Sequence, residues 1–237
     1  MIQTEGVFVG GGAISAPIIG EDFNWSGGDG TYQVLDDGGG NWRIKFLSSG
    51  TFTPLKNMVI DAFLVGGGGG AGSSYCGEGG AGYTTTVRSV VLTANTAYSI
   101  VVGAAGTNGN PSSAGGETTA FTASAAGGKN TSNGTSSSKR PGGAGGSGGA
   151  GYVSPVATTT GGTDGGDGTS SATTGGKGQG TTTREFGEAD GTLYASGGGS
   201  NLSATVANSG NGGRNGITSI APADGIVVIR QHKEVAA

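Results

Sequence analysis

Apolar and polar side chains alternate along several short segments, and no segment shows the repeat of an amphipathic helix. The clearest alternation is at 42–47, Trp-Arg-Ile-Lys-Phe-Leu, where apolar and basic residues take turns. A period of two is typical of a half-buried strand. Asp37-Gly38, just before it, favours a hairpin turn. We therefore expect a small β unit here, in the region that holds both tryptophans.

Three further segments predict strands that frame the middle of the chain. Residues 58–65 form an apolar, β-rich run that ends directly in five glycines. Residues 83–103 read as a strand, a turn and a returning strand, and 226–230 read as a closing strand. Their β-branched and aromatic side chains suit a pleated surface. We expect one sheet of these segments to tie both ends of the glycine-rich region together.

Glycine dominates the chain between these strands. It supplies 56 of the 237 residues, more than three times the average share of about 7%. From residue 103 to 216, glycine clusters alternate with Ser/Thr/Asn-rich spacers of uneven length, which excludes a solenoid of fixed repeat. Because glycine loses the most backbone freedom on folding, such a chain either stays disordered or needs positions without a Cβ.

The longest cluster, GGAGGSGGAG at 142–151, has a non-glycine residue at every third position. A period of three predicts an extended helix of three residues per turn, whose backbone groups point outward and must pair with close neighbours. A flexible linker is the alternative, but the framing strands favour packing. We expect the following glycines to be structural: Gly66, Gly67, Gly68, Gly69, Gly70, Gly142, Gly143, Gly145, Gly146, Gly148 and Gly149.

Taken together, these patterns predict an all-β fold with packed, extended glycine helices of three residues per turn and little or no α-helix. Residues 1–48 are expected to form an N-terminal β attachment module. Residues 49–230 are expected to form the glycine-rich body, and 231–237 a frayed tail.

Charge and cysteine content exclude several classes of protein. The net charge is −4 and only 12% of residues are charged, which is the wrong balance for a general nucleic-acid binder. The apolar runs are too short to insert into a membrane. A single cysteine, Cys76, permits no intramolecular disulfide. The first twelve residues lack the pattern of a signal peptide, so we expect assembly in a reducing cytosol.

Catalytic residue sets are scarce. The single histidine, His232, is expected to be a solvated residue of the tail, which argues against Ser–His, Cys–His and zinc sites. The glycine–lysine sequences at 127–129 and 175–177 lack the spacing of a phosphate loop. We therefore expect no enzyme activity, cofactor or metal ion.

Carboxylates are the remaining candidates for chemistry. Glu185, Glu188 and Asp190 lie close together in sequence, as do Asp164 and Asp167. A glycosidase-like pair or a calcium site are the functional alternatives. We expect these carboxylates to be solvated charges on loops.

The order of four motifs resembles a known family. These are GTFTP at 50–54, FLVGGGGG at 63–70, YSIVVGAAG at 98–106 and GIVVIR at 225–230. The series resembles the glycine-rich domain of bacteriophage and prophage tail-fibre and virion proteins, over residues 49–230. The alternation of glycine clusters with variable spacers is also similar to the tail-tip adhesins of T-even-like phages, in which packed polyglycine-II helices form a sandwich. This similarity implies an all-β fold with a packed polyglycine-II helix sandwich for this chain.

This resemblance implies a non-enzymatic virion surface protein, a phage tail-associated adhesin whose loops between glycine helices bind a glycan or protein of the host cell. Loops on a rigid scaffold commonly carry recognition. The candidate receptor-binding residues are Arg140, Tyr152, Arg184, Phe186 and Tyr194. The alternative is that the three aromatic residues plug the ends of the glycine lattice.

The implied partners are other virion proteins of the tail fibre, baseplate or capsid, bound through the N-terminal module. A homotrimer is possible, although no heptad pattern supports one. Two other functions stay open at this point. One is a capsid decoration or head-fibre protein, and the other is an ice-binding protein, against which the irregular spacers argue.

Overall fold

Strands and extended segments make up the part of the chain that the structure describes. The computed structural model describes residues 16–134, 140–152, 166–169, 175–176, 183–199, 202–215 and 219–232. Within these residues, ten strands form two antiparallel sheets of five, and the only helical element is a 3₁₀ turn, η1 (Glu185–Gly187). The predicted all-β class is confirmed.

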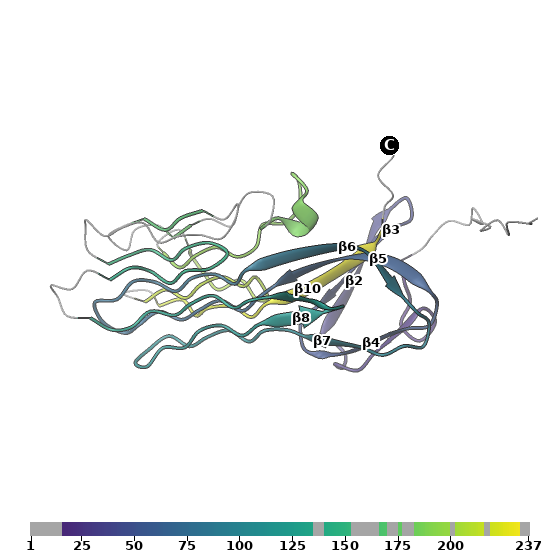
Figure 1. Ribbon diagram of the computed structural model, residues 1–237, viewed down its shortest axis with the longest axis horizontal. Coiled ribbons are helices and arrows are strands. Elements are labelled where there is room, and N and C mark those ends of the chain that lie inside the picture. The colour runs from purple at the N-terminus through teal and green to yellow at the C-terminus, as the bar shows by residue number, and fades with distance from the viewer. Residues whose placement is uncertain are drawn as a thin grey trace, which may run out of the picture.

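Figure 1 shows the two sheets at one end of the molecule and extended, glycine-rich segments side by side at the other. The first sheet has the order β1 (Phe23–Trp25), β4 (Gly50–Pro54), β7 (Tyr98–Val101), β8 (Thr118–Ala120) and β9 (Ala123–Ala125). The second sheet has the order β2 (Tyr32–Gly38), β3 (Asn41–Phe46), β10 (Ile226–Gln231), β5 (Met58–Val65) and β6 (Thr84–Leu92).

The predicted hairpin at Asp37-Gly38 is confirmed as the β2–β3 pair. Gly38, Gly39 and Gly40 all have positive φ angles, of 76°, 60° and 79°. A left-handed backbone at consecutive positions is accessible at low cost only to glycine. In β3, alternate side chains from Trp42 onward are buried, as the two-residue period predicts.

Strands β1 to β3 belong to the same two sheets as the rest of the chain. Trp25 of β1 lies opposite Phe52 of β4, and Ile44 of β3 lies opposite Ile229 of β10. The boundary expected at residue 48 therefore does not divide the sheets, and from residue 16 onward the expected N-terminal module is part of the sandwich. Strands this short bury an apolar face only by joining a larger sheet.

The central sheet expected from 58–65, 83–103 and 226–230 forms in part. β10 pairs with β5, and β5 pairs with β6. The two strands within 83–103 were expected to pair with each other. This expectation is wrong, because β7 pairs with β4 and β8 in the other sheet. Leu92 and Ile100, on either side of the turn, are both buried between the sheets, so the turn carries the chain from one sheet to the other.

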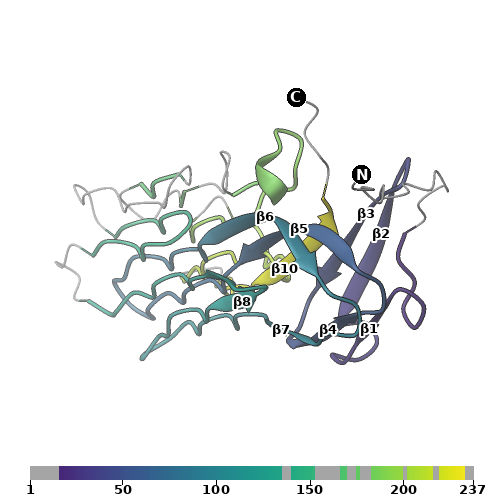
Figure 2. The same cartoon turned by 45° about the vertical axis from the view of Figure 1, so that its right-hand side comes forward.

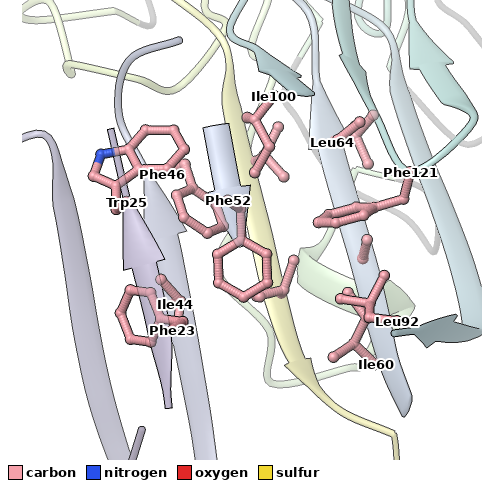
Figure 3. Packing of buried hydrophobic residues seen from close by; sticks show 14 of the residues in the cluster. Phe23, Trp25, Ile44, Phe46, Phe52, Ile60, Leu64, Leu92, Ile100 and Phe121 are labelled. Carbon is pink, nitrogen blue, oxygen red and sulfur yellow. The ribbon is translucent and has the colours of Figure 1, made fainter. Parts of the chain in front are cut away.

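An aromatic core lies between the two sheets, as Figure 3 shows. Phe46 packs between Trp25 and Phe52, with ring centroids 4.7 and 5.5 Å away. Phe52 also contacts Phe23 at 5.5 Å. Such contacts add about 0.5–1.5 kcal/mol each beyond the apolar area that they bury. The few aromatic residues of this chain are thus concentrated where they hold the two sheets together.

Residues 66–70 leave the end of β5, and their backbone groups bond to segments on several sides. The N–H groups of Gly66 and Gly69, the first and fourth residues of the run, donate to segment 80–83, at 2.9 and 2.8 Å. The second and fifth donate to segment 113–116, at 3.0 and 2.9 Å, and the third donates to Ala223 at 2.8 Å. The direction of these bonds therefore repeats every three residues.

The carbonyl groups of the same run follow this repeat. Those of Gly67 and Gly70 accept from segment 128–131, at 2.9 and 3.1 Å, and those of Gly68 and Ala71 accept from segment 106–109, at 2.8 and 2.9 Å. A Cβ at any glycine of the run would overlap a neighbouring carbonyl oxygen. The oxygens that it would meet are those of Ala126, Ala104, Asn211, Lys129 and Thr107, in chain order of the glycines.

The cluster at 142–151 folds differently from its three-residue pattern. The N–H of Gly149 donates to the carbonyl of Gly143 at 2.9 Å, and Arg140 pairs with Tyr152. The cluster therefore turns back on itself near Ser147 and forms two antiparallel arms, so the expectation of one continuous helix through it is wrong. Ser147 is fully buried at this turn.

Candidate functional site

Turns from distant parts of the sequence meet at the end of the glycine-rich segments that lies farthest from the sheets (left in Figure 1). Gly72 forms a bridge with Gly109. The N–H of Ser73 donates to Oδ1 of Asn133 at 2.7 Å, and Nδ2 of Asn130 donates to the carbonyl of Ser112 at 2.9 Å. We call this surface the tip; it comprises the turns 72–76, 108–112 and 131–134 together with Arg140 and Tyr152.

The tip carries two of the candidate receptor-binding residues, Arg140 and Tyr152. Their backbones exchange two hydrogen bonds, at 2.7 and 3.3 Å. The ring of Tyr152 meets that of Tyr75 edge-on, with centroids 5.8 Å apart. Tyr75 is 47% exposed and has a positive φ of 48°. A basic group and two phenol rings in edge-on contact thus lie together at the tip, where Tyr75 is exposed and Arg140 and Tyr152 are half-buried.

Asparagine and threonine side chains hold the tip turns together, which the sequence analysis did not foresee. Oδ1 of Asn108 accepts from the N–H of Ala71 at 2.8 Å, while its Nδ2 donates to the carbonyl of Ile220 at 2.9 Å. Thr131 accepts from Gly72 and donates to the carbonyl of Gly77, at 3.0 and 2.6 Å. These bonds satisfy backbone groups where the glycine segments end.

A sequence signal for this arrangement is present. Gly-x-Asn recurs at 106–108, 128–130 and 213–215, where a glycine segment reaches the tip. The side chain of Asn215 donates to the carbonyl of Gly72. An asparagine side chain offers both a donor and an acceptor, and Asn108 uses both to bond two neighbouring backbones at once.

The other three candidates, Arg184, Phe186 and Tyr194, lie away from the tip. They belong to the loop 183–195, which includes η1 and covers the outer face of the second sheet near β5 and β6 (Figure 2). Phe186 and Tyr194 are buried, with exposed fractions of 1% and 6%. Both rings pack on Phe63 of β5, with centroids at 6.1 and 5.5 Å. Their rings are therefore part of an outer core and do not face solvent.

A buried carboxylate anchors this loop to the sheet. Glu185 is 2% exposed, and its two oxygens lie 2.6 Å from Nη1 of Arg43 and 3.4 Å from Nζ of Lys45. The hydroxyl of Tyr194 donates to the same carboxylate at 3.2 Å. Burial, followed by the charge of Glu185, raises the pKa of Tyr194 above its ordinary value. The expectation that Glu185 is a solvated loop charge is wrong, because the cations of β3 balance its burial.

A polar pocket of about 340 Å³ lies beside η1. Its lining includes Glu188, Asp190 and Thr192 of the loop, together with Arg230 of β10. Nη1 of Arg230 donates to Glu188 at 2.5 Å, and the guanidinium stacks on Phe186 at 4.2 Å. Glu188 of the loop and Arg230 of the sheet thus form an ion pair that fastens the loop.

A comparison with protein families gives a match that covers the glycine segments. The model of a family described as a glycine-rich domain matches residues 47–230. The chain belongs to this family of glycine-rich domains. Among curated proteins, none matches the chain.

The match begins at residue 47, before β4, and ends at Arg230 in β10. The family region therefore covers the glycine-rich domain and the strands that frame it. In the structure, however, those strands complete their sheets only with β1, β2 and β3, which precede the match.

Within the described residues of the glycine-rich domain, no group of three or more His, Cys, Asp and Glu side chains could hold a metal ion. Asp164 lies outside those residues. None of the helical turns that the structure describes has the length and apolar character needed to cross a bilayer.

Two buried ionisable groups, Cys76 and Glu78, lie where the chain turns back from the tip. Burial, together with the charge of Glu78, raises the pKa of the Cys76 thiol to about 11, so it is not a thiolate at neutral pH. Burial also raises the pKa of Glu78 to about 7, although its carboxylate accepts from the N–H of Asn215 at 2.7 Å. Ionisation of Glu78 is thus unfavourable inside the domain.

We expect Glu78→Gln to stabilise the domain at alkaline pH and to have little effect in acid. A carboxyl whose folded pKa is raised binds its proton more tightly in the folded state, so stability falls as pH rises from about 4.5 to about 7. The amide removes that loss, which amounts to at most about 3 kcal/mol. Thermal unfolding at pH 5 and pH 8 measures the difference. Glu117→Gln, at an exposed carboxylate, is the control. If the difference in stability between Glu78→Gln and the wild type were the same at pH 5 and pH 8, the burial argument would be contradicted.

Proposed function

We propose that this protein is a surface component of a bacteriophage particle, a tail-associated adhesin that binds the host cell surface through its tip. The observation that carries the proposal is the gathering of the tip turns. A long glycine-rich scaffold holds turns from distant parts of the chain at one end, where they present an exposed Tyr75 and the half-buried Arg140 and Tyr152. Aromatic rings and guanidinium groups are enriched among the residues that dominate binding energy.

The scaffold supports the proposal through its backbone bonding. We propose that the glycine segments pack as polyglycine-II helices. The three-residue repeat of hydrogen-bond directions around 66–70 supports this geometry, because a helix with three residues per turn sends successive N–H groups to three different neighbours. Such a scaffold is rigid, so the tip turns keep their shape before a receptor arrives, which lowers the entropic cost of binding.

The ligand class that fits the tip is a glycan or a polar protein surface. Tyrosine offers an apolar ring with a polar end, which suits both sugar faces and protein surfaces. Arg140 contributes charge, and its Nε is buried without a hydrogen-bond partner among the described residues. Attachment to the particle would then use the opposite end, where β1 to β3 lie (Figure 2).

We expect Tyr75→Ser and Tyr152→Ser to weaken binding to host cells by about tenfold or more each, the size of a moderate hot spot. The measurement uses the fluorescently labelled full chain. It is titrated onto cells of strains that adsorb the phage and onto cells of strains that resist adsorption. Val91→Ser is the control, because Val91 is 71% exposed on β6, away from the tip. Equal binding of all variants to both kinds of cell would overturn the adhesin role.

A second experiment separates tail from head. Antibodies against the tip should block adsorption of particles, and immunogold should label the tail. If the gold labelled the capsid and adsorption were unaffected, the adhesin role would be rejected in favour of a capsid decoration or head-fibre protein.

A further inference from the structure

Ser89, His232 and Asp61 form a hydrogen-bonded chain on the outer face of the second sheet. Oγ of Ser89 lies 3.1 Å from Nε2 of His232, and Nδ1 of His232 lies 2.6 Å from Oδ1 of Asp61. The expectation that His232 is a solvated tail residue is wrong. Its side chain is only 21% exposed, and its N–H donates to the carbonyl of Val59 at 2.9 Å, so it extends the pairing of β10 with β5.

Asp61 is built to remain a carboxylate. It is 1% exposed, and it accepts hydrogen bonds from the N–H of Ser89, from Nη1 of Arg88 and from Nε of Arg230, each at 3.2 Å. Burial alone would raise the pKa of Asp61, but the bonds from His232, Ser89 and Arg230 outweigh it and hold the pKa below its ordinary value. A buried anion on Nδ1 fixes the imidazole with Nε2 free to accept a proton.

Ser89 occupies an unusual backbone position. The register of β5 and β6 shifts opposite Asp61, and Ser89 has a positive φ of 56°. Bulges of this kind re-aim a side chain, and strained backbone is concentrated at functional sites. Here the bulge directs the Ser89 hydroxyl toward His232, while the residue stays exposed on a strand at the edge of its sheet.

We propose that Ser89, His232 and Asp61 form a second site that hydrolyses small carboxylic esters. Ser89 is the nucleophile, His232 is the general base and acid, and Asp61 is a positioning residue. Oγ of Ser89 attacks the acyl carbon while its proton passes to Nε2 of His232. The bond to the leaving alcohol breaks, and His232 returns the proton to that alcohol.

Water completes the cycle. His232 takes a proton from water, the water oxygen attacks the acyl carbon, the bond to Ser89 breaks, and Oγ recovers its proton from His232. The sum is ester plus water giving acid plus alcohol, with no oxidant or cofactor. Ser89 is exposed, so an ester in solution can reach its hydroxyl. Nη1 and Nη2 of Arg88 donate to Asp61 and to the carbonyl of Phe186, so its positive charge lies beside the carboxylate of the site.

The test uses the full chain, a fluorophosphonate probe and p-nitrophenyl acetate. Ser89→Gly removes the hydroxyl and suits a positive φ, so it keeps the fold. His232→Gln removes the base, and Ser99→Ala, an exposed serine on β7, is the control. The folding of each variant is checked by its melting temperature.

We expect the probe to label the wild type and Ser99→Ala at Ser89, and to leave Ser89→Gly unlabelled. Labelling and ester hydrolysis should each fall about 100-fold or more in His232→Gln, the contribution of a general base. Absence of labelling in the folded wild type, or labelling that does not depend on His232, would overturn the proposal. Labelling without hydrolysis of the ester would overturn its assignment as an esterase. Neither result bears on the tip, which shares no residue with this site.

Discussion

Gly68→Ala is expected to destabilise the protein by at least about 3 kcal/mol, at the upper end of the cost of overpacking a core. Its Cβ would overlap the carbonyl oxygen of Asn211, and this neighbour is backbone that is itself bonded to the N–H of Ala223. A side chain that clashes with backbone cannot be relieved by a rotamer change. For a chain of this length, the melting temperature should fall by roughly 10 °C.

Gly28→Ala is the matched control. Gly28 has a φ of 90°, but a Cβ there would meet nothing within 4 Å. Only the backbone penalty of about 1–2 kcal/mol applies. If both variants lost the same stability, the close approach of the glycine segments would not be what excludes side chains.

Amide hydrogen exchange on the same pair of proteins reports on the glycine segments directly. In the wild type, the N–H groups of 66–70 are all bonded to other segments and should exchange slowly. In Gly68→Ala, exchange should become fast in this run and in segment 211–213, which it contacts. Fast exchange at 66–70 in the wild type would contradict the proposed polyglycine-II packing and favour a flexible linker.

Asp61→Asn is expected to cost about 3 kcal/mol at pH 7. Asp61 lies between Arg88, Arg230 and His232, and Arg230 is 8% exposed. The amide removes the charge that balances a buried guanidinium, although Glu188 still pairs with Arg230. Unfolding by denaturant, with the exposed Asp29→Asn as control, measures the loss.

The effect of this substitution should depend on pH in one direction. The folded pKa of Asp61 lies below its unfolded value, so its contribution is present above about pH 4 and is lost as pH falls through the folded pKa. Wild type and Asp61→Asn should therefore converge in stability as the pH falls through the folded pKa of Asp61. A stability difference that persists unchanged in acid would mean that shape, and not charge, is what Asp61 supplies.

Local pattern was enough to place most strands. The alternation at 42–47 predicted β3, the apolar runs predicted β5 and β10, and Asp37-Gly38 predicted the β2–β3 hairpin. Each of these signals depends on residues that are neighbours in sequence, so one sequence is enough to recognise them. The abundance of glycine likewise indicated segments that approach one another closely, as the backbone contacts of Gly66 to Gly70 bear out.

The choice of partners was decided only in three dimensions. Periodicity says which face of a strand is apolar, but not which strand it meets, so β6 and β7 were expected to pair and instead lie in different sheets. The three-residue pattern at 142–151 is equally compatible with a straight run and with two arms, and the turn at Ser147 follows from contacts with other segments.

The candidate sites show the same division. The sequence indicated that loops between glycine clusters deserve attention, and two of the five candidates, Arg140 and Tyr152, do lie together at the tip. Phe186 and Tyr194 were candidates as exposed aromatic residues of a loop, but both rings pack on Phe63 of β5. The pattern of apolar positions, together with the composition, indicated that this chain is extended, glycine-rich and all-β. Tertiary structure determined which side chains meet, because Asp61, Ser89 and His232 are brought together by strand pairing across up to 171 positions of sequence.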